Sequence, residues 1–295
     1  MIVTLTLNPA FDVHCRAKSL ALDRENIAEV SSRIPGGKGI NLSRALCAAG
    51  TENRAVCLLG SENADEFCRS LSLDLIKITV PGRIRENITI HTENGRETRI
   101  SFRGFSCDDA VCDRLFELPL KDGDILTLTG RLSDGMSLEK IKKMLIFYAE
   151  KGVKTVIDSK SFALSDIIEC KPFMIKPNEE EMAEYFGDCD ARQKARELVS
   201  LGVCNVMLSE GARGATLFCE EGTFRAVPPE IKAISTVGAG DSSIAGFLSA
   251  YIAGKSKLVC LKTAVAFGTA ACLTEGTEPP RLSDINAILP RITEG

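Results

Sequence analysis

The chain has 295 residues, 44% of them hydrophobic, so it can bury a large core, and its twelve scattered cysteines contain no Cys-x-x-Cys pair. Lysine and arginine number 36 against 40 acidic residues, a formal net charge of -4 without a long run of one sign. This balance and the lack of an apolar stretch of membrane-spanning length disfavour nucleic-acid and membrane partners, and we expect a cytoplasmic protein.

Short β-rich runs alternate with helical patterns along most of the chain. This order is typical of βαβ crossovers, which build a mainly parallel sheet covered by helices on both faces. One such helix is expected at residues 138–149, where Ile141, Leu145 and Ala149 share a face. The sequence therefore predicts a doubly wound α/β body with core strands at residues 2–7, 54–59, 124–129, 154–158, 173–176 and 204–208.

Two stretches interrupt this alternation and predict a small separate sheet. They are residues 12–35 and residues 84–103, and in the second a hairpin is expected around Asn94-Gly95. A further hairpin is expected at residues 214–227. Because no linker or internal repeat divides the sequence, we expect one domain over residues 1–295.

Polar residues follow the first predicted strand and a glycine cluster. Asp12 comes after strand 2–7, and Gly36-Gly37-Lys38-Gly39-Ile40-Asn41 precedes a helical run. Glycines let backbone approach a ligand closely, while Lys38 can meet a phosphate or hydroxyl and Asn41 a sugar hydroxyl. A turn carrying a solvated lysine is the alternative interpretation.

The predicted hairpin at 84–103 carries further candidates. Arg85 and Asn87 alternate onto one face, and the planar guanidinium fork of Arg85 suits a phosphate. Arg103 is an additional cation for a substrate phosphate.

A third motif, Lys176-Pro177-Asn178-Glu179-Glu180-Glu181, joins the end of a predicted strand to a helix. Open parallel sheets bind ligands at such strand ends. Asn178 and Glu181 share a helical face and could hold Mg²⁺, directly or through water. Ordinary helix capping is the alternative.

The segment Ser235-Thr236-Val237-Gly238-Ala239-Gly240-Asp241-Ser242 leads into an apolar periodic stretch and predicts a glycine-rich loop that opens a helix. N–H groups at a helix start lack intrahelical acceptors and bind phosphate or a phosphoryl oxyanion. Asp241 could accept the proton of a hydroxyl that attacks the γ-phosphorus of ATP, with Gly238, Ala239 and Gly240 as the anion hole. An aspartate that only caps the helix is the alternative.

Together these motifs resemble those of the ribokinase-like (PfkB) sugar kinases, in the branch of 1-phosphofructokinases and tagatose-6-phosphate kinases. The resemblance runs nearly end to end. Its markers are the segments 7–12, 36–41, 85–87, 176–181, 209–214 and 235–242.

The resemblance implies a three-layer α/β/α sandwich whose small β lid, formed by the segments near 12–35 and 84–103, closes over a phosphosugar and often pairs in a homodimer. It places Asp241 as the base, with ATP and Mg²⁺ near it. The matching substrate-binding positions are Asp12, Gly37, Lys38, Asn41, Arg85 and Asn87, with Arg103 and Arg131 added as cations. The matching ATP-binding positions are Lys176, Asn178, Ser209, Gly211 and Gly214, and the metal positions are Asn178 and Glu181.

One segment departs from the family pattern. Thr129-Gly130-Arg131-Leu132-Ser133-Asp134-Gly135 stands where the family usually has Ser-Gly-Ser-Leu-Pro-x-Gly, so Arg131 either adds a cation or narrows the pocket. The segment 235–242 resembles the 1-phosphofructokinases more than the tagatose-6-phosphate kinases, and this resemblance implies fructose 1-phosphate as the substrate, phosphorylated at its 6-hydroxyl to fructose 1,6-bisphosphate. Tagatose 6-phosphate or another ketose is the alternative.

Two other classes remain open at this stage. A non-catalytic regulator that binds sugar phosphate or nucleotide would keep the same fold. A dinucleotide-dependent oxidoreductase fits worse, because Ser243 replaces the third glycine of its fingerprint.

Overall fold

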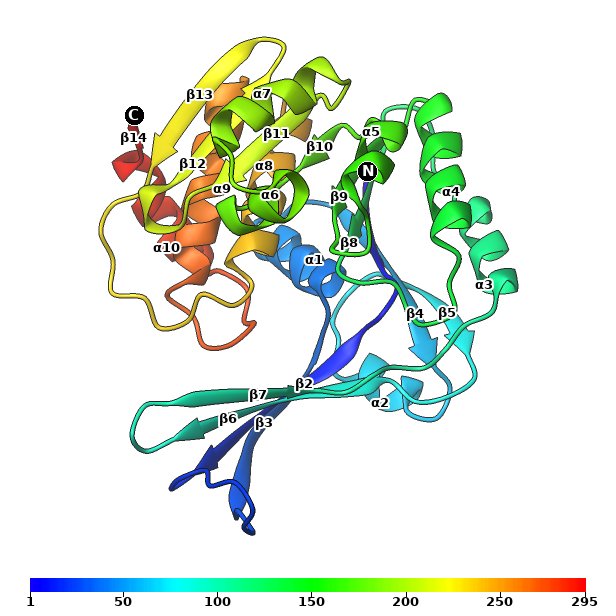
Figure 1. The fold of residues 1–295 in the computed structure, drawn as a ribbon, viewed down its shortest axis with the longest axis vertical. Coiled ribbons are helices and arrows are strands. Elements are labelled where there is room, and N and C mark those ends of the chain that lie inside the picture. Colours follow the sequence, from blue (N-terminus) through cyan, green and yellow to red (C-terminus); the bar gives the residue numbers. More distant parts are fainter.

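A ten-stranded sheet forms the centre of the computed structural model, which describes residues 1–295, and a separate four-stranded sheet projects away from it (Figure 1). The strands are β1 (Ile2–Thr6), β2 (Ala10–Ala17), β3 (Ala28–Gly36), β4 (Asn53–Gly60), β5 (Leu75–Val80), β6 (Arg85–Thr92), β7 (Glu97–Ser101), β8 (Ile125–Thr129), β9 (Lys154–Asp158), β10 (Met174–Ile175), β11 (Asn205–Ser209), β12 (Ala215–Cys219), β13 (Gly222–Val227) and β14 (Thr293–Glu294). The helices are α1 (Lys38–Ala48), α2 (Ala64–Arg69), α3 (Asp109–Arg114), α4 (Leu138–Glu150), α5 (Leu164–Cys170), α6 (Glu179–Phe186), α7 (Ala191–Ser200), α8 (Ala239–Ile252), α9 (Lys257–Ala271) and α10 (Leu282–Ile288). None of these helices has the length and apolar character that crossing a bilayer requires.

The large sheet confirms the α/β prediction, and all six predicted core strands are present. Its order is β14-β13-β12-β11-β10-β9-β8-β1-β4-β5, with parallel pairing from β11 to β5 and antiparallel pairing from β11 to β14. Strand β10 is shorter than predicted. Pro172 and Pro177 bracket it, and proline cannot donate a ladder hydrogen bond.

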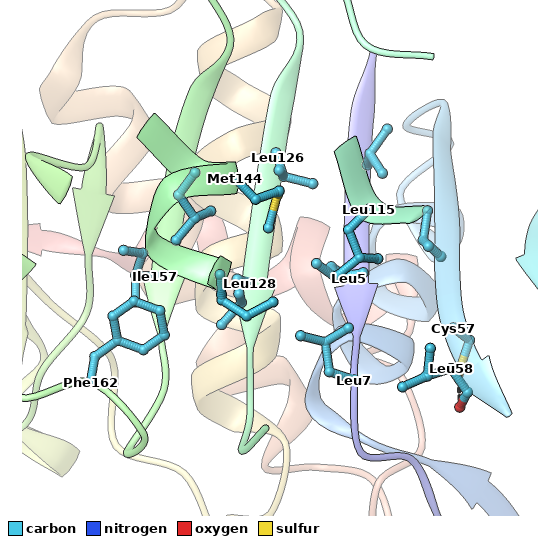
Figure 2. Packing of buried hydrophobic residues seen from close by; sticks show 14 of the residues in the cluster. Leu5, Leu7, Cys57, Leu58, Leu115, Leu126, Leu128, Met144, Ile157 and Phe162 are labelled. Carbon is cyan, nitrogen blue, oxygen red and sulfur yellow. Dashed lines mark hydrogen bonds between the residues drawn. The ribbon is translucent and has the colours of Figure 1, made fainter. Parts of the chain in front are cut away.

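Helices cover both faces of this sheet, and each face has its own core. Leu126, Leu128 and Ile157 of the strands pack with Met144 of α4 on one face (Figure 2). On the other face, side chains of α1, α8, α9 and α10 form a second core. Strand residues therefore alternate between two apolar layers, which is why the strands read as almost continuous hydrophobic runs.

The small sheet confirms that the two interrupting stretches pair with each other. Its order is β3-β2-β6-β7, with β2 and β6 parallel and the β6–β7 hairpin antiparallel. Gly95 closes the hairpin turn with a φ of 77°, a conformation that glycine adopts readily. Only Leu7–Pro9 separates β1 from β2, so residues of the small sheet lie close to the ends of the central strands.

Helices α1 and α8 pack against each other, and both begin at glycine-rich segments. This packing brings two glycine clusters, about 200 residues apart in the chain, to one place.

Candidate active site

Asp241 lies in the first turn of α8, and the side chain is buried, with 5% exposure. Its Oδ2 accepts a hydrogen bond from Nδ2 of Asn41 on α1, at 3.2 Å. Burial raises the pKa of Asp241 to about 7, although the positive charge of Lys38 opposes this effect. A carboxyl group with a pKa near neutrality is suited to accepting a proton.

The start of α8 also presents groups that can bind an anion. Gly238 caps the helix with a φ of 80°, and the N–H groups of Gly240 and Asp241 form no backbone hydrogen bond. The ammonium group of Lys176 lies 3.0 Å from the position that a Cβ on Gly240 would occupy. Free N–H groups and a cation together favour a phosphoryl group at this point.

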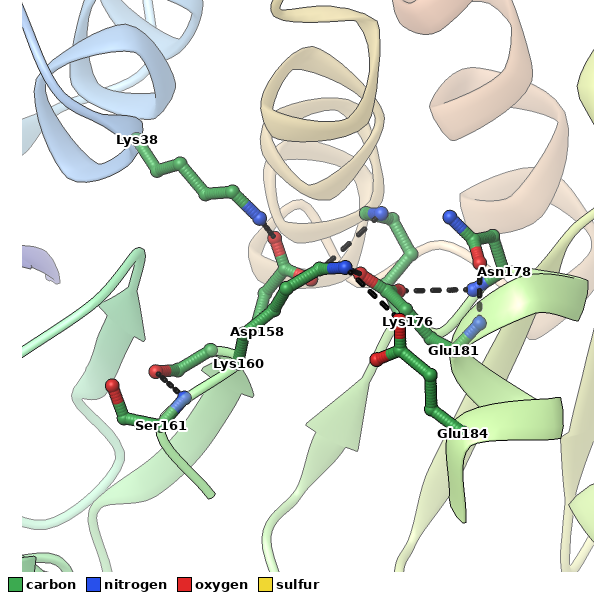
Figure 3. A network of polar contacts seen from close by, with 9 residues as sticks. Lys38, Asp158, Lys160, Ser161, Lys176, Asn178, Glu181 and Glu184 are labelled. Atoms are coloured by element: carbon green, nitrogen blue, oxygen red, sulfur yellow. Dashed lines mark hydrogen bonds and ion pairs between the residues drawn. The ribbon is translucent and has the colours of Figure 1, made fainter. Parts of the chain in front are cut away.

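Two lysines converge on Asp158 beside this helix start (Figure 3). The Nζ of Lys38 lies 2.8 Å from Oδ2 of Asp158, and the Nζ of Lys176 lies 3.9 Å from Oδ1. Burial alone would raise the pKa of Asp158, but the two lysines outweigh it and hold that pKa below its ordinary value. Lys38 thus contacts Asp158, whereas the sequence placed it with Arg85 near a substrate phosphate.

A second cluster lies on the small sheet. Asn87 donates from Nδ2 to Oδ1 of Asp12 at 2.9 Å, and Arg85 donates from Nη1 to Oδ1 of Asn87 at 3.2 Å. Burial lowers the pKa of Arg85, and the nearby charges of Arg99 and Arg131 act in the same direction. Three guanidinium groups close enough to repel one another favour an anionic ligand.

A cleft of about 810 Å³ separates the small sheet from the body. Asp12 and Arg99 line it on the sheet side, and Ser235–Val237, which leads directly to Gly238, lines it on the body side.

Gly37 lies in the turn before α1, with a φ of 128°. Arg103 and Arg131 are exposed, and Arg103 forms no hydrogen bond or ion pair.

The predicted nucleotide segments adjoin one another. Asn178 and Ser209 form a parallel bridge, and the N–H of Ser209 donates to the carbonyl of Pro177 at 2.9 Å. Gly211 and Gly214 turn the following loop with φ values of 60° and 94°. These residues border the end of β10, which Lys176 directly follows.

The Asn178–Glu181 pair forms a reciprocal helix cap. Oδ1 of Asn178 accepts from the N–H of Glu181 at 2.7 Å, and Oε2 of Glu181 accepts from the N–H of Asn178 at 3.2 Å. The amide oxygen of Asn178 is therefore already used, whereas Oε1 of Glu181 has only a 4.0 Å ion pair with Lys160. Mg²⁺ usually takes one or two carboxylates together with water and phosphate oxygens, so Glu181 fits such an ion better than Asn178 does.

Sequence reasoning missed three residues of this region. Asp158 is the last residue of a predicted parallel strand, a position that often faces a ligand. Arg99 pairs in register with Thr89, two residues from Asn87, so the alternation of the hairpin could have identified it. Arg44 follows Asn41 by one helical turn, forms no hydrogen bond and lies near the charges of Glu278 and Asp12.

An α/β/α sandwich with a smaller attached sheet and a glycine-rich helix start is the architecture of the ribokinase-like fold. The chain belongs to the pfkB family of carbohydrate kinases, which it matches over residues 11–284. As a carbohydrate kinase of this family, it transfers phosphate to a hydroxyl group.

Relatives of known name cover nearly the whole chain. The sequence is 33% identical over 294 residues to 1-phosphofructokinase of Bacillus subtilis (strain 168), covering 94% of this chain and 95% of the relative. It is 29% identical over 303 residues to 1-phosphofructokinase of Vibrio cholerae, covering 99% and 95%. The structure is similar to phosphofructokinase-2 from Escherichia coli in complex with fructose-6-phosphate, with a TM-score of 0.91, 26% identity and 98% of both chains covered.

Proposed function

We propose that this kinase transfers the γ-phosphoryl group of ATP to the 6-hydroxyl of fructose 1-phosphate, giving fructose 1,6-bisphosphate and ADP. The observation that carries the proposal is the buried carboxylate of Asp241 beside free N–H groups at the start of α8. A base next to an anion hole is what an attacking hydroxyl and a transferred phosphoryl group require.

In this mechanism Asp241 takes the proton of the 6-hydroxyl as the new oxygen–phosphorus bond forms and the bond to ADP breaks. The N–H groups of Gly240 and Asp241 stabilise charge on the transferred group. Asn41 holds the carboxylate of Asp241 in place, and Asp12 and Asn87 bind sugar hydroxyls. Arg85 binds the existing phosphate, supported by Arg99 and Arg131.

The nucleotide is proposed to lie along Asn178, Ser209 and the glycines of the following loop. Glu181 would hold Mg²⁺ through Oε1, which has only the 4.0 Å ion pair with Lys160, and water and phosphate oxygens would supply the other ligands. When bound, the ion neutralises charge on the ATP phosphates.

The named relatives favour fructose 1-phosphate, since both sequence relatives above are 1-phosphofructokinases. Fructose 6-phosphate is the second candidate, because the similar Escherichia coli structure holds it. Tagatose 6-phosphate stays the alternative within the sequence branch. In every case Arg85 and the two arginines near it, Arg99 and Arg131, favour a sugar that carries a phosphate.

The substrate test is ADP release with Mg·ATP and, in turn, fructose 1-phosphate, fructose 6-phosphate, tagatose 6-phosphate, unphosphorylated fructose and ribose. We expect kcat/KM to be highest for fructose 1-phosphate, by at least about tenfold, equivalent to about 1.4 kcal/mol of transition-state binding. A higher kcat/KM for another phosphosugar would identify that sugar as the substrate. ADP release with ribose and with none of the phosphosugars would refute the proposed phosphate site.

The small sheet is proposed to act as the lid of the predicted single domain and to pair with a second copy. Val30, Ile100 and Phe102 of this region expose 64%, 45% and 51% of their surface, which is unusual for large apolar side chains. We expect light scattering to give twice the chain mass of 31.8 kDa. A monomer at micromolar concentration would contradict this pairing.

A further inference from the structure

Asp158 stands between two lysines that come from opposite sides of the candidate reaction centre. Lys38 begins α1 and belongs to the segment assigned to the sugar, whereas Lys176 directly follows β10 and belongs to the segment assigned to the nucleotide. Figure 3 shows the two ammonium groups approaching the one carboxylate. Each carboxylate oxygen of Asp158 faces one lysine, at 2.8 Å for Lys38 and 3.9 Å for Lys176.

Lys176 lacks the contacts that a structural lysine would have. Its side chain is 9% exposed and its ammonium group forms no hydrogen bond, only the long ion pair with Asp158. A nearly buried ammonium group with unused donors is costly unless a ligand completes its contacts. Because it lies against Gly240, the missing partner belongs to the anion hole of α8.

Lys38 contacts the other oxygen of the same Asp158 carboxylate, at 2.8 Å. Its charge is close enough to Asp241 to oppose the rise of that residue's pKa, and Asp241 raises the pKa of Lys38 in return. Burial alone would lower the pKa of Lys38, but Asp158 and Asp241 outweigh it, so the side chain is a cation at neutral pH. Lys38 is therefore a neighbour of the proposed base.

We propose that Lys38 and Lys176 form a clamp, in which the two ammonium groups contact the phosphoryl group from opposite sides during its transfer. Asp158 is the positioning residue that holds both lysines in place. This inference rests on the proposed function and assigns to Lys38 a role different from binding the substrate's own phosphate. Lys176 contacts the transferred group from the ADP side and Lys38 from the acceptor side. Their positive charges stabilise the negative charge that spreads over the three equatorial oxygens of the phosphoryl group during transfer.

The test compares Lys38→Met and Lys38→Arg with a control outside the site, Lys143→Met. Lys143 lies on α4, is 67% exposed and pairs with Glu139 of the same helix. For Lys38→Met we expect kcat to fall about 100-fold, the scale for losing one donor to a transition state, with KM for the phosphosugar changed less than about threefold. Lys38→Arg should recover part of kcat, and Lys143→Met should match the wild type within about twofold.

A binding measurement separates the clamp from effects on ground-state binding. Calorimetry would give the affinity for ADP alone and the affinity for ADP together with aluminium fluoride and phosphosugar. Aluminium fluoride imitates the phosphoryl group during its transfer. Lys38→Met should leave the ADP affinity unchanged and weaken the aluminium fluoride complex about 100-fold. Equal weakening of both complexes would overturn the clamp, and so would a large rise in KM for the phosphosugar with kcat preserved.

Asp158→Asn tests the positioning role. If Asp158 acts through the lysines, the kcat loss of the Asp158→Asn, Lys38→Met double variant is well below the product of the two single losses. Losses that multiply would show that Asp158 does not act through Lys38. Thermal melting of each variant identifies losses that only follow unfolding. An inactive wild type would refute the proposed function, whereas an active wild type matched by Lys38→Met would refute the clamp alone.

Discussion

Replacing Asp241 by asparagine is expected to lower kcat by about two to four orders of magnitude, the usual contribution of a positioned base. Asparagine has the same shape and keeps an oxygen for the hydrogen bond from Asn41, but it cannot take the proton of the sugar hydroxyl. The fold should be unaffected, because burial disfavours the charged carboxylate and the neutral amide that replaces it has the same shape. KM for ATP should stay within about twofold, since the proposed nucleotide contacts lie elsewhere.

The measurement is steady-state ADP release for Asp241→Asn beside Asp284→Asn, a control at a partly exposed residue in the first turn of α10. The wild type adds a pH criterion: kcat/KM should fall as the pH drops below about 7, because protonation removes the base of the free enzyme. The residual activity of Asp241→Asn should lack this acid limb. Turnover of this variant within threefold of the wild type would disprove the assignment of the base.

Replacing Arg85 by alanine is expected to raise KM for the phosphosugar about 100-fold, with a smaller effect on kcat. Truncating one partner of a buried charged pair costs about 2–5 kcal/mol, and Arg85 carries a guanidinium fork suited to two phosphate oxygens. Its Nε is buried without a partner, so the side chain has donors available for a ligand. Arg85→Lys should fall between the wild type and alanine, because it keeps the charge and loses the fork.

The discriminating measurement uses fructose with and without its phosphate. Arg85→Ala should lose selectivity for the phosphorylated sugar, whereas Arg24→Ala, at the exposed tip of the β2–β3 hairpin, should behave as the wild type. Equal losses on both sugars would mean that Arg85 supports the small sheet structurally and does not bind phosphate.

Local patterns predicted the architecture well. Alternating strand and helix signals gave the parallel sheet, and the Asn-Gly turn gave the β6–β7 hairpin, because each depends on residues near in sequence. The capping interpretation of Asn178 and Glu181 is confirmed for the same reason, since both contacts lie within one helical turn. Strand β5 was missed because four of its six side chains are only partly covered or exposed at the edge of the sheet, which weakens the apolar signal.

The candidate site was predictable only in part. Motifs identified Asp241 and Asn41 separately, but their hydrogen bond joins residues 200 positions apart and follows from the packing of α1 on α8. The ion pair between Lys38 and Asp158 joins residues 120 positions apart, and no local sequence pattern indicates it. Arg131 departs from the family pattern, and only the fold brings its charge near Arg85.

The sequence by itself determined the order of strands and helices, the glycine-rich start of α8 and the aspartate beside it, because turn chemistry and periodicity act over a few residues. Tertiary structure alone decided which charges meet. Burial sets the pKa of Asp241 near neutrality, and the parallel order of β9 and β10 puts Asp158 next to Lys176. Electrostatic energies depend on distance and burial in the folded chain, and a linear sequence specifies neither.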